Sequence, residues 1–449
     1  MTKQSGFDRR SFLKGAGMTA LAGAVGTGSV TAAAAETARA SGGAYNFDEV
    51  YDRFGTECIK WDSQVTKWGD GKIKVGMGIA DMDFRNAPCI SEALQKRIAH
   101  ENWGYTRVAD SYIESIVDWN RERHGMEVDP DSIVISSGVH PGLIAALNTL
   151  CDPAQKVLVN TPTYNGFYGD LRWSRTIANE SQMINNDGKW EIDWDDFEAR
   201  LGPDTPAFLL CNPQNPTGNC WSEEDLMRMG QLCLENQVTV LADEIHCDFV
   251  MKGQKYTPFA GLPDKDIVDN SITFKAISKT FSLAAMKNAY WFTTNPVLKD
   301  RVRYNHRVDL NTLGMVANEA AYREGAEWLD QLLDYIDGNH EYVQSYMRES
   351  LPGMSYTKAE GTYLAWVDVG GVMDKIDAQG KSDASQSSDD PKRPVDIVEE
   401  WLVDNAGIQL NPGRNYGPGG ETFMRMNLGA PRPLIKTALD SIAEAVDKA

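Results

Sequence analysis

The sequence between residues 112 and 260 alternates helix-like and strand-like segments, which restricts the folds open to this chain. Runs of apolar and β-branched residues, typical of strands, occupy 157–162, 208–213 and 238–243. Amphipathic runs, typical of helices, occupy 111–125, 197–201 and 223–236. This alternation is typical of a mostly parallel sheet with helices on both faces. We therefore predict an α/β fold that binds its ligand beyond the carboxyl ends of the strands.

The composition excludes several classes of partner. The chain has 449 residues, enough for one large or two medium domains, and 42% of them are hydrophobic. Its formal charge is −20, of which residues 1–40 contribute +3 (five Lys/Arg minus two Asp/Glu), so the remainder carries −23. So acidic a surface repels nucleic acid and anionic membranes. A small molecule is the expected partner.

Lys279 lies in a polar Ser-Lys-Thr break between two mostly apolar runs of the stretch 271–287. Residues 271–278 (SITFKAIS) are typical of a short buried strand, and SLAAM at 282–286 is compatible with a helix. We expect a lysine at such a break to point into a cleft, where partial loss of water favours a neutral, nucleophilic amine. Most lysines are solvated surface charges, so this position alone does not identify a catalytic group.

Three upstream stretches place polar residues just after predicted strands. Asn215 lies in a pair of Asn-Pro turns, and Asp243 ends a strand, with His246 three positions later. Residues 135–146 are predicted to form a strand, a Ser-Gly turn and the start of a helix, which offers N–H groups to a phosphate. Each feature alone is equally explained as a turn, a helix cap or a loop.

Taken in this order and followed by Ser278-Lys279, the stretches resemble the fold-type-I pyridoxal-phosphate enzymes, the aspartate aminotransferase superfamily. The spacings also resemble those of the family, with 28 residues from Asn215 to Asp243 and 36 from Asp243 to Lys279. The resemblance implies pyridoxal 5′-phosphate held covalently by Lys279, with its ring nitrogen facing Asp243. It also implies a smaller α+β domain beside the large one.

The same resemblance assigns further contacts to the cofactor. Asn215 is expected to contact the ring oxygen, and His246 either does the same or supports Asp243. The residues expected to hold the phosphate are Ser137, Gly138, Val139, Ser278 and, as a weaker candidate, Lys287.

Two more residues are implied in the substrate pocket. Tyr164 is expected to stack on the cofactor ring, but Asn165 and Gly166 replace the second aromatic and the proline that often follow in the family. The shape of the pocket therefore stays open. Arg425, in a strand at 423–427, is expected to bind the substrate α-carboxylate, because a guanidinium pairs with a carboxylate through two parallel hydrogen bonds.

Three motifs resemble the cystathionine β-lyase and C–S lyase branch of the superfamily. They are ADMDF at 80–84, which ends a predicted strand beginning at 76, GYTR at 104–107 and DEIHCDF at 243–249. The resemblance places Tyr105 at the cofactor phosphate of a neighbouring subunit, which implies a homodimer with shared active sites. The expected reaction is β-elimination from cystathionine or another cysteine S-conjugate, giving a thiol, pyruvate and ammonia.

Two other functions remain open. An aminotransferase would use every residue named above and redirect the Cα proton to the cofactor instead of expelling a thiol. A cofactor-binding regulatory protein is the third alternative, since some relatives also act in regulation. The intact set of Lys279, Asp243 and Arg425 weighs against it.

The chain is predicted to begin with an export signal. Residues 1–40 carry a twin-arginine signature, DRRSFLK at 8–14, before a Gly/Ala-rich apolar run. We expect export by the twin-arginine route to the periplasm, cell envelope or medium, with no stable membrane span after signal removal.

Three structural parts are predicted to follow. They are an N-terminal segment at 41–91 that adds to the small domain, a large cofactor-binding domain at 92–325 and a small C-terminal domain at 326–449. Within the last, residues 377–394 have almost no apolar side chains and are predicted to form a flexible insertion.

Seven cysteines occur without a C-x-x-C motif or a metal-ligand spacing. Buried free thiols and no metal are expected, although one disulfide remains open in an oxidising compartment.

Overall fold

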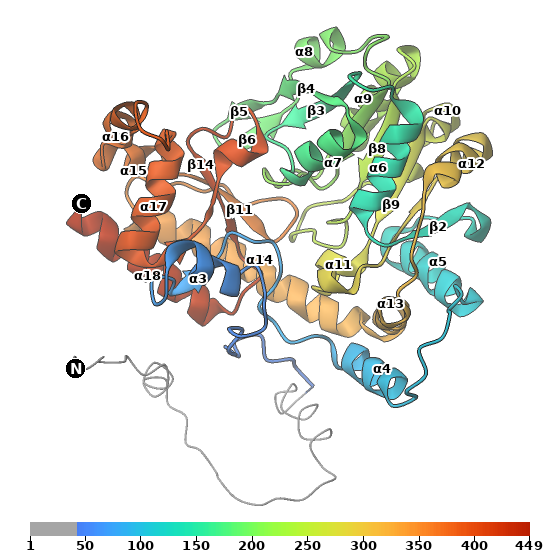
Figure 1. Cartoon of the computed structure of the whole chain (residues 1–449), viewed down its shortest axis with the longest axis horizontal. Helices are drawn as coiled ribbons and strands as arrows, with labels where there is room; N and C mark the ends of the chain where they lie inside the picture. The colour runs from blue at the N-terminus through green and yellow to red at the C-terminus, as the bar shows by residue number, and fades with distance from the viewer. Residues whose placement is uncertain (1–42) are drawn as a thin grey trace, which may run out of the picture. The chain divides into compact units, whose positions relative to one another are not determined.

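A seven-stranded sheet forms the middle of the large domain, on the right in Figure 1, within the compact unit Tyr45–Ala449. The computed structural model describes residues 43–449, so the predicted signal at 1–40 lies outside the described part. The strands, in sheet order, are β2 (Ile133–Ser136), β10 (Ala289–Phe292), β9 (Ser271–Lys275), β8 (Thr239–Asp243), β7 (Ala207–Cys211), β3 (Lys156–Thr161) and β4 (Ile177–Gln182). Only β10 runs antiparallel to its neighbours, which confirms the predicted mostly parallel sheet.

Helices cover both faces of the sheet because the strands alternate apolar side chains between the faces. Val157 and Val159 of β3 pack with one set of helices, whereas Leu158 packs with the other. The first set is α6 (Val139–Leu150), α7 (Gly166–Ser174) and α12 (Pro296–Asn305). The second is α8 (Trp194–Ala199), α9 (Glu223–Glu235) and α10 (Lys265–Asp269).

A further group of helices packs around Tyr290 and Phe292 of β10. It contains α4 (Pro88–Ile98), α5 (Asp110–His124), α13 (Thr312–Glu324) and the first half of α14 (Ala326–Ser350). Helices α13 and α14 follow each other directly and are separated at Gly325. A Cβ at Gly325 would lie 2.5 Å from the carbonyl oxygen of Ala321 and 2.7 Å from the Phe281 ring, so the close turn requires glycine.

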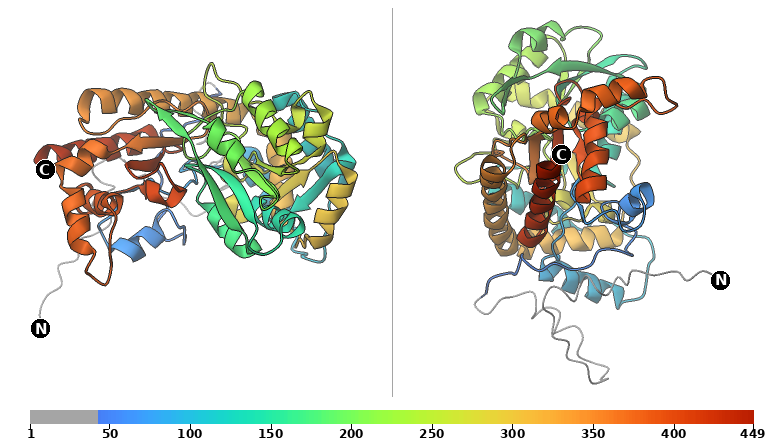
Figure 2. Two further views of the ribbon diagram at one scale, coloured as in Figure 1. Left: turned by 90° about the horizontal axis from the view of Figure 1, so that it is seen from above. Right: turned by 90° about the vertical axis from the view of Figure 1, so that its left-hand side faces the viewer.

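The small domain is built mostly from the C-terminal part of the chain. Its sheet has the antiparallel order β11 (Leu364–Asp368), β14 (Phe423–Asn427), β13 (Asn411–Pro412). A second pair joins β1 (Val75–Gly76) to β12 (Ile408–Gln409), so the N-terminal segment contributes to this domain. Its helices are α3 (Asp62–Trp68), α15 (Gly370–Lys375), α16 (Ala378–Ser385), α17 (Pro394–Ala406) and α18 (Arg432–Lys448). Figure 2 shows the orange and red C-terminal elements, with the blue α3 among them, gathered on one side of the green and cyan part of the large domain.

Helix α14 belongs to both hydrophobic cores. Trp328 and Leu329 near its start lie in the core beside β10, whereas Val343 and Met347 near its end lie in the core of the small domain. One continuous helix therefore connects the two domains.

The predicted flexible insertion at 377–394 is partly helical, so that prediction is wrong for its first half. Asp377 accepts a hydrogen bond from the Gly380 N–H and caps α16. Ala378 is buried in the small-domain core, and the Ser382 hydroxyl donates to the carbonyl oxygen of Lys392. Small residues and hydroxyl hydrogen bonds hold this segment, and neither produces an apolar pattern in the sequence.

Two predicted strand boundaries are also wrong. The strand expected at 76–84 is limited to β1, and residues 77–84 are irregular. The strand expected at 271–278 ends at Lys275, and α11 (Ile277–Thr280) then carries Lys279. The run at 282–286 contains a 3₁₀ turn, η3 (Ala284–Met286), in place of an α-helix.

The remaining short elements are a hairpin and three 3₁₀ turns. They are β5 (Ile184–Asn186), β6 (Lys189–Glu191), η1 (Pro130–Ser132), η2 (Phe259–Gly261) and η4 (Gly413–Tyr416). Among the helices of residues 43–449, none is long and apolar enough to cross a membrane. All seven cysteines fall in this part of the chain, and all are free thiols.

Candidate active site

Three adjacent parallel strands bring the predicted cofactor residues to one edge of the sheet. Asp243 is the last residue of β8, Asn215 follows β7, and Lys279 follows β9. The register pairs Cys211 with Asp243, and the Asn215 N–H donates to the Cys211 sulfur over 3.4 Å. These three residues, far apart in the sequence, thus lie close together at the carboxyl ends of the strands.

Lys279 has the properties of a nucleophilic amine. Its Nζ donates a hydrogen bond to the carbonyl oxygen of Ala80 over 2.9 Å. Burial, with the nearby positive charge of Arg425, lowers the pKa of Lys279 to about 8. A substantial fraction of the amine is therefore neutral near physiological pH, as attack on a carbonyl carbon requires.

Asp243 is buried, with 3% of its surface exposed. Its carboxylate accepts a hydrogen bond from the Ile245 N–H over 3.1 Å. Burial raises the pKa of Asp243 to about 7, while the Ile245 bond and the charge of His140 act in the opposite direction. Burial disfavours the charged form of this carboxylate. A ligand that places a positively charged ring N–H beside it would therefore stabilise the charged carboxylate.

Arg425 is buried in the middle of β14 with part of its hydrogen-bonding capacity unused. One terminal nitrogen donates to the side-chain oxygen of Asn215 over 3.2 Å, and the other to the carbonyl oxygen of Gly78 over 2.8 Å. Its Nε has no hydrogen-bond partner among the described residues. Because buried polar groups are normally paired, the unused donor indicates a ligand such as a carboxylate.

His246 is buried against Tyr363, with ring centroids 5.6 Å apart. Its Nδ1 has no partner among the described residues, and their hydrogen bonds include none between His246 and Asp243. Direct support of Asp243 is therefore not seen. Burial lowers the pKa of His246 well below its usual value, so the ring is neutral and its free nitrogen remains available to a ligand.

The predicted phosphate residues lie at two helix starts. Ser137, Gly138 and Val139 form the turn into α6, where backbone N–H groups are unpaired by the helix itself. Gly138 has φ 150°, a conformation that favours glycine. Ser278 lies in α11 beside Lys279. Lys287, which follows η3, is exposed and has φ 49°.

Tyr164 lies next to His140, a residue that the sequence analysis did not select. The two rings are 5.7 Å apart and inclined by 33°. At Gly166 a Cβ would lie 2.4 Å from the Tyr164 ring and 2.8 Å from that of His140. The departure at Asn165-Gly166 therefore makes room for this aromatic pair.

Tyr105 is fully exposed on the segment between α4 and α5, with a relative exposure of 111%. The structure does not bury it in a core. An exposed tyrosine at this position is available to a second subunit.

The irregular segment at 77–84 supplies hydrogen-bond acceptors from the main chain. The carbonyl oxygens of Gly78 and Ala80 accept from Arg425 and Lys279, and those of residues 79 and 81 accept from Asn427. This role of the motif could not be predicted from the sequence, because main-chain carbonyls leave no signal in residue types.

The acidic residues of this motif anchor the segment. Arg53 pairs with Asp81 and Asp83 at 2.6 Å each, and the buried Lys60 pairs with Asp83 at 2.7 Å. Because Lys60 is nearly inaccessible to solvent, its charge is matched by this carboxylate rather than by water.

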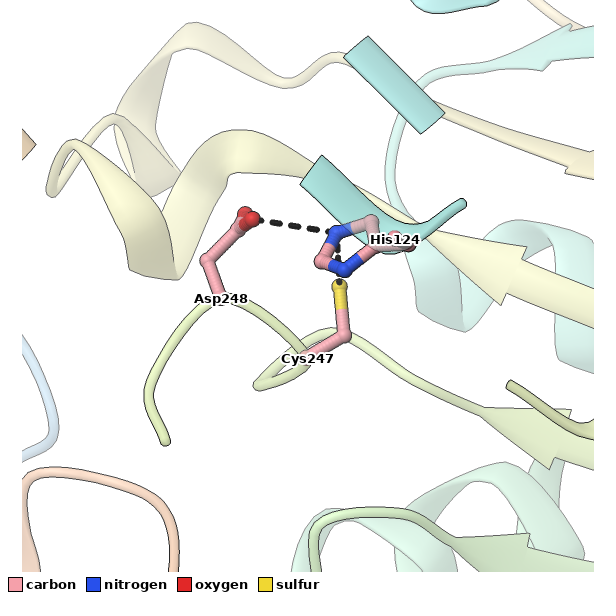
Figure 3. Close-up of side chains that lie close together, drawn as sticks. All are labelled: His124, Cys247 and Asp248. Carbon is pink, nitrogen blue, oxygen red and sulfur yellow. Dashed lines mark hydrogen bonds and ion pairs between the residues drawn. The ribbon is translucent and has the colours of Figure 1, made fainter. Parts of the chain in front are cut away.

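Three further side chains, His124, Cys247 and Asp248, cluster beside Thr280, the residue after Lys279 (Figure 3). Their potential metal-binding atoms lie within 4.8 Å of one another. Asp248 already accepts from Thr280 over 2.7 Å and pairs with His124 at 3.2 Å. Burial alone would raise the pKa of Asp248, but the bonds from His124 and Thr280 outweigh it and hold the pKa below its usual range. This cluster ties α11 to α5 through contacts that engage both carboxylate oxygens of Asp248.

The donor set fits one kind of cofactor. Lys279 suits an aldehyde, Asp243 a protonated ring nitrogen, and the turn at residues 137–139 a phosphate. The nitrogens of His246 and Arg425 that have no partner among the described residues can bind an oxygen atom of the ligand or a carboxylate. Pyridoxal phosphate carries the first three groups, so the fold and the site together define a fold-type-I pyridoxal-phosphate protein.

Comparison with known proteins gives the family. Residues 72–442 match the aminotransferase class I and II family, and the chain belongs to it. It is 35% identical to cystathionine β-lyase PatB of Bacillus subtilis, over 89% of this chain and 100% of the relative. The predicted family and its C–S lyase branch are confirmed.

Two solved structures share the fold. The C–S lyase of Staphylococcus hominis, bound to pyridoxal phosphate, has a TM-score of 0.80 and 31% identity, covering 90% of this chain and 98% of that one. A putative aminotransferase of Clostridium difficile 630, also bound to pyridoxal phosphate, has a TM-score of 0.80 and 32% identity, covering 90% and 100%. The predicted cofactor is thus the one that these relatives hold.

Proposed function

We propose that the chain is a pyridoxal-phosphate-dependent C–S β-lyase acting on cystathionine or other cysteine S-conjugates. The observation that carries the proposal is its 35% identity to a cystathionine β-lyase over the whole of that relative. The arrangement of Lys279, Asp243 and Arg425 around one edge of the sheet supports it, since the reaction needs a base, a ring-nitrogen partner and a carboxylate anchor.

Substrate binding falls to Arg425. Its free Nε and its terminal nitrogens form a planar fork that suits the α-carboxylate of an amino acid. The contact to the Gly78 carbonyl would be exchanged for the substrate, at little cost because one hydrogen bond replaces another. The carboxylate then fixes the orientation of the Cα–H bond.

Proton transfer falls to Lys279. The fraction of its amine that is neutral because of the lowered pKa would be the base that takes the Cα proton of a substrate held at the cofactor. The bound cofactor supplies an electron sink for the pair left on Cα. Asp243 holds the ring-nitrogen proton that makes this sink effective.

The overall reaction balances without an oxidant. The Cα–H and Cβ–S bonds break, the electron pair from Cα forms the Cα–Cβ double bond, and the sulfur leaves as a thiolate that takes up a proton. Water then hydrolyses the three-carbon fragment to pyruvate and ammonium. No 2-oxo acid is consumed.

The absence of a co-substrate provides the test. The purified holoenzyme is incubated with cystathionine, and pyruvate and thiol are measured without any 2-oxo acid. Formation of both in equal amounts supports the lyase. Turnover that strictly requires a 2-oxo acid would instead establish an aminotransferase, which the similarity to the Clostridium difficile protein favours as the second candidate. A folded protein with neither cofactor absorbance nor turnover would point to a regulatory role.

We also propose a homodimer in which Tyr105 of each chain contacts the cofactor phosphate of the other. The full exposure of Tyr105 supports this role. Sedimentation at equilibrium tests the assembly, and a monomer that retains full turnover would exclude it.

Export by the twin-arginine route is proposed for residues 1–40. The support is the DRRSFLK signature at 8–14. Fractionation of cells expressing the wild-type chain and the double variant Arg9→Lys, Arg10→Lys tests it. Equal export of both would overturn it.

A further inference from the structure

His140 lies in the first turn of α6 and is paired with an acidic side chain of α7. Its Nδ1 lies 2.9 and 2.8 Å from the two carboxylate oxygens of Asp170 in α7. Asp170 is buried, with 3% of its surface exposed, so its charge depends on this partner. A hydrogen bond between an imidazolium and a carboxylate is stronger than one between neutral groups, which favours the charged pair.

The other edge of His140 faces the predicted ring-stacking residue. Its Nε2 lies 3.3 Å from the Tyr164 hydroxyl. Any side chain at Gly166 would overlap both rings. The imidazole, the tyrosine and the glycine thus form one packed unit, in which His140 limits the positions open to the Tyr164 ring.

The charged groups around His140 come from three elements. Asp170 of α7 and Asp243 of β8 are negative, and Lys279 of α11 is positive when protonated. The hydrogen bond to Asp170 raises the pKa of His140, and Asp243 adds to the effect. Partial burial of the ring, whose side chain is still 46% exposed, and the charge of Lys279 oppose it. A positive imidazolium in turn lowers the pKa of Asp243, against the effect of burial.

We propose that His140, held as an imidazolium by Asp170, is a positioning residue of the cofactor site that orients the Tyr164 ring and supplies the counter-charge for the Asp243 carboxylate. This inference rests on the proposed cofactor site. It does not depend on whether the reaction is an elimination or a transamination. His140 acts through Tyr164 and Asp243, and no direct contact with the substrate is needed.

The decisive measurement is the imidazole titration of the full chain, followed by NMR with and without pyridoxal phosphate. In the wild type, His140 should titrate above 6.5. In Asp170→Asn, which keeps the size of the side chain but not its charge, the midpoint should fall, because the hydrogen bond to a carboxylate that raises the pKa of His140 is lost. An unchanged His140 midpoint in Asp170→Asn would overturn the proposal.

A second measurement follows the bound cofactor. The pH titration of the visible absorbance band and the dissociation constant of pyridoxal phosphate are compared for wild type, His140→Gln and His140→Phe. Both variants remove the charge, and we expect a shifted absorbance midpoint and about tenfold weaker binding. Gly166→Ala displaces the rings without changing the charge and should weaken binding while leaving the His140 titration above 6.5. Wild-type spectra and affinity in both His140 variants would overturn the proposal.

These readouts separate this inference from the proposed function. A protein that binds pyridoxal phosphate with the expected titrations but produces no pyruvate from cystathionine would refute the lyase assignment and leave the role of His140 supported. A protein that shows lyase turnover, but whose His140 midpoint does not respond to Asp170→Asn, would support the lyase assignment and refute the role of His140.

Discussion

The Nζ of Lys279 donates a hydrogen bond to the main-chain carbonyl of Ala80, a residue 199 positions earlier in the chain. The Tyr363 hydroxyl donates to the same oxygen over 2.8 Å. Residues 77–84 therefore hold the reactive amine in place through main-chain atoms. The identity of the Ala80 side chain has no part in this bond.

Replacing the lysine should abolish both cofactor attachment and turnover. Lys279→Ala removes the buried amine that follows β9 and contacts the Ala80 carbonyl, so we expect no lysine-bound absorbance band and a fall in turnover of about 10³-fold or more. Absorbance spectra and pyruvate assays measure the two effects. Lys265→Ala, an exposed lysine in α10, is the matched control and should behave as the wild type.

Cofactor capture should depend on pH through the Lys279 amine. Because burial lowers the pKa of Lys279 to about 8, the neutral fraction rises with pH and is nearly complete above that value. The rate at which cofactor-free protein captures pyridoxal phosphate, followed by stopped-flow absorbance, should rise and then level off above about pH 8. A rate that continues to rise up to the usual value of 10.5 would contradict the lowered pKa.

The fork of Arg425 should matter more than its charge. Arg425→Lys keeps the positive charge but loses the paired donors, and we expect kcat/KM for cystathionine to fall about 10- to 100-fold, or about 1.5–3 kcal/mol. Steady-state kinetics measure the loss. The control Arg172→Lys, on the exposed end of α7, should change nothing. Unchanged kinetics in Arg425→Lys would remove Arg425 from carboxylate binding.

Shared active sites should permit complementation between inactive subunits. Tyr105→Phe and Lys279→Ala damage different chains of a mixed dimer, so one of its two sites is intact. After unfolding and refolding an equimolar mixture, we expect about a quarter of the wild-type activity, since half of the dimers are mixed. Each variant refolded alone is the control. No recovery, with mixed dimers demonstrated by native mass spectrometry, would exclude the contribution of Tyr105 across the interface.

The Asp248 cluster should stabilise the fold in a pH-dependent manner. Asp248→Asn removes a buried charge bonded by His124 and Thr280 and should cost about 1–3 kcal/mol at pH 7. Since the folded-state pKa of Asp248 is lowered, this contribution is present above the usual value of 3.8 and is lost as pH falls through the folded pKa. Urea unfolding at several pH values measures it.

The control for that series is Asp300→Asn, an exposed acid in α12. Its unfolding free energy should match the wild type at each pH. A constant difference between Asp248→Asn and the wild type down to the lowest pH would contradict the lowered pKa.

The sheet and the strand-end residues were predictable because both depend on local pattern. Runs such as 238–243 are apolar on both faces, as a buried parallel strand requires, and parallel strands end at the same edge. Asn215, Asp243 and Lys279 therefore converge on topology alone. Their chemical identity then matches the family that the comparisons establish.

Other features of the site could not be read from residue patterns. The pairing of His140 with Asp170 joins two helices through a contact that exists only after α6 and α7 pack on the sheet. The acceptor carbonyls of Gly78 and Ala80 depend on main-chain direction, which the residue types do not encode. Neither feature could be predicted from the sequence, because tertiary packing, and not local propensity, determines which groups come into contact.

Helix α14 has a consequence for unfolding. Its first turns complete the core of the large domain, and its last turns complete the core of the small one. Loss of either core removes the packing that keeps this 25-residue helix formed, so the other core loses part of its wall at the same time. The two domains are therefore expected to melt in a single cooperative transition, as one thermodynamic unit despite their separate sheets.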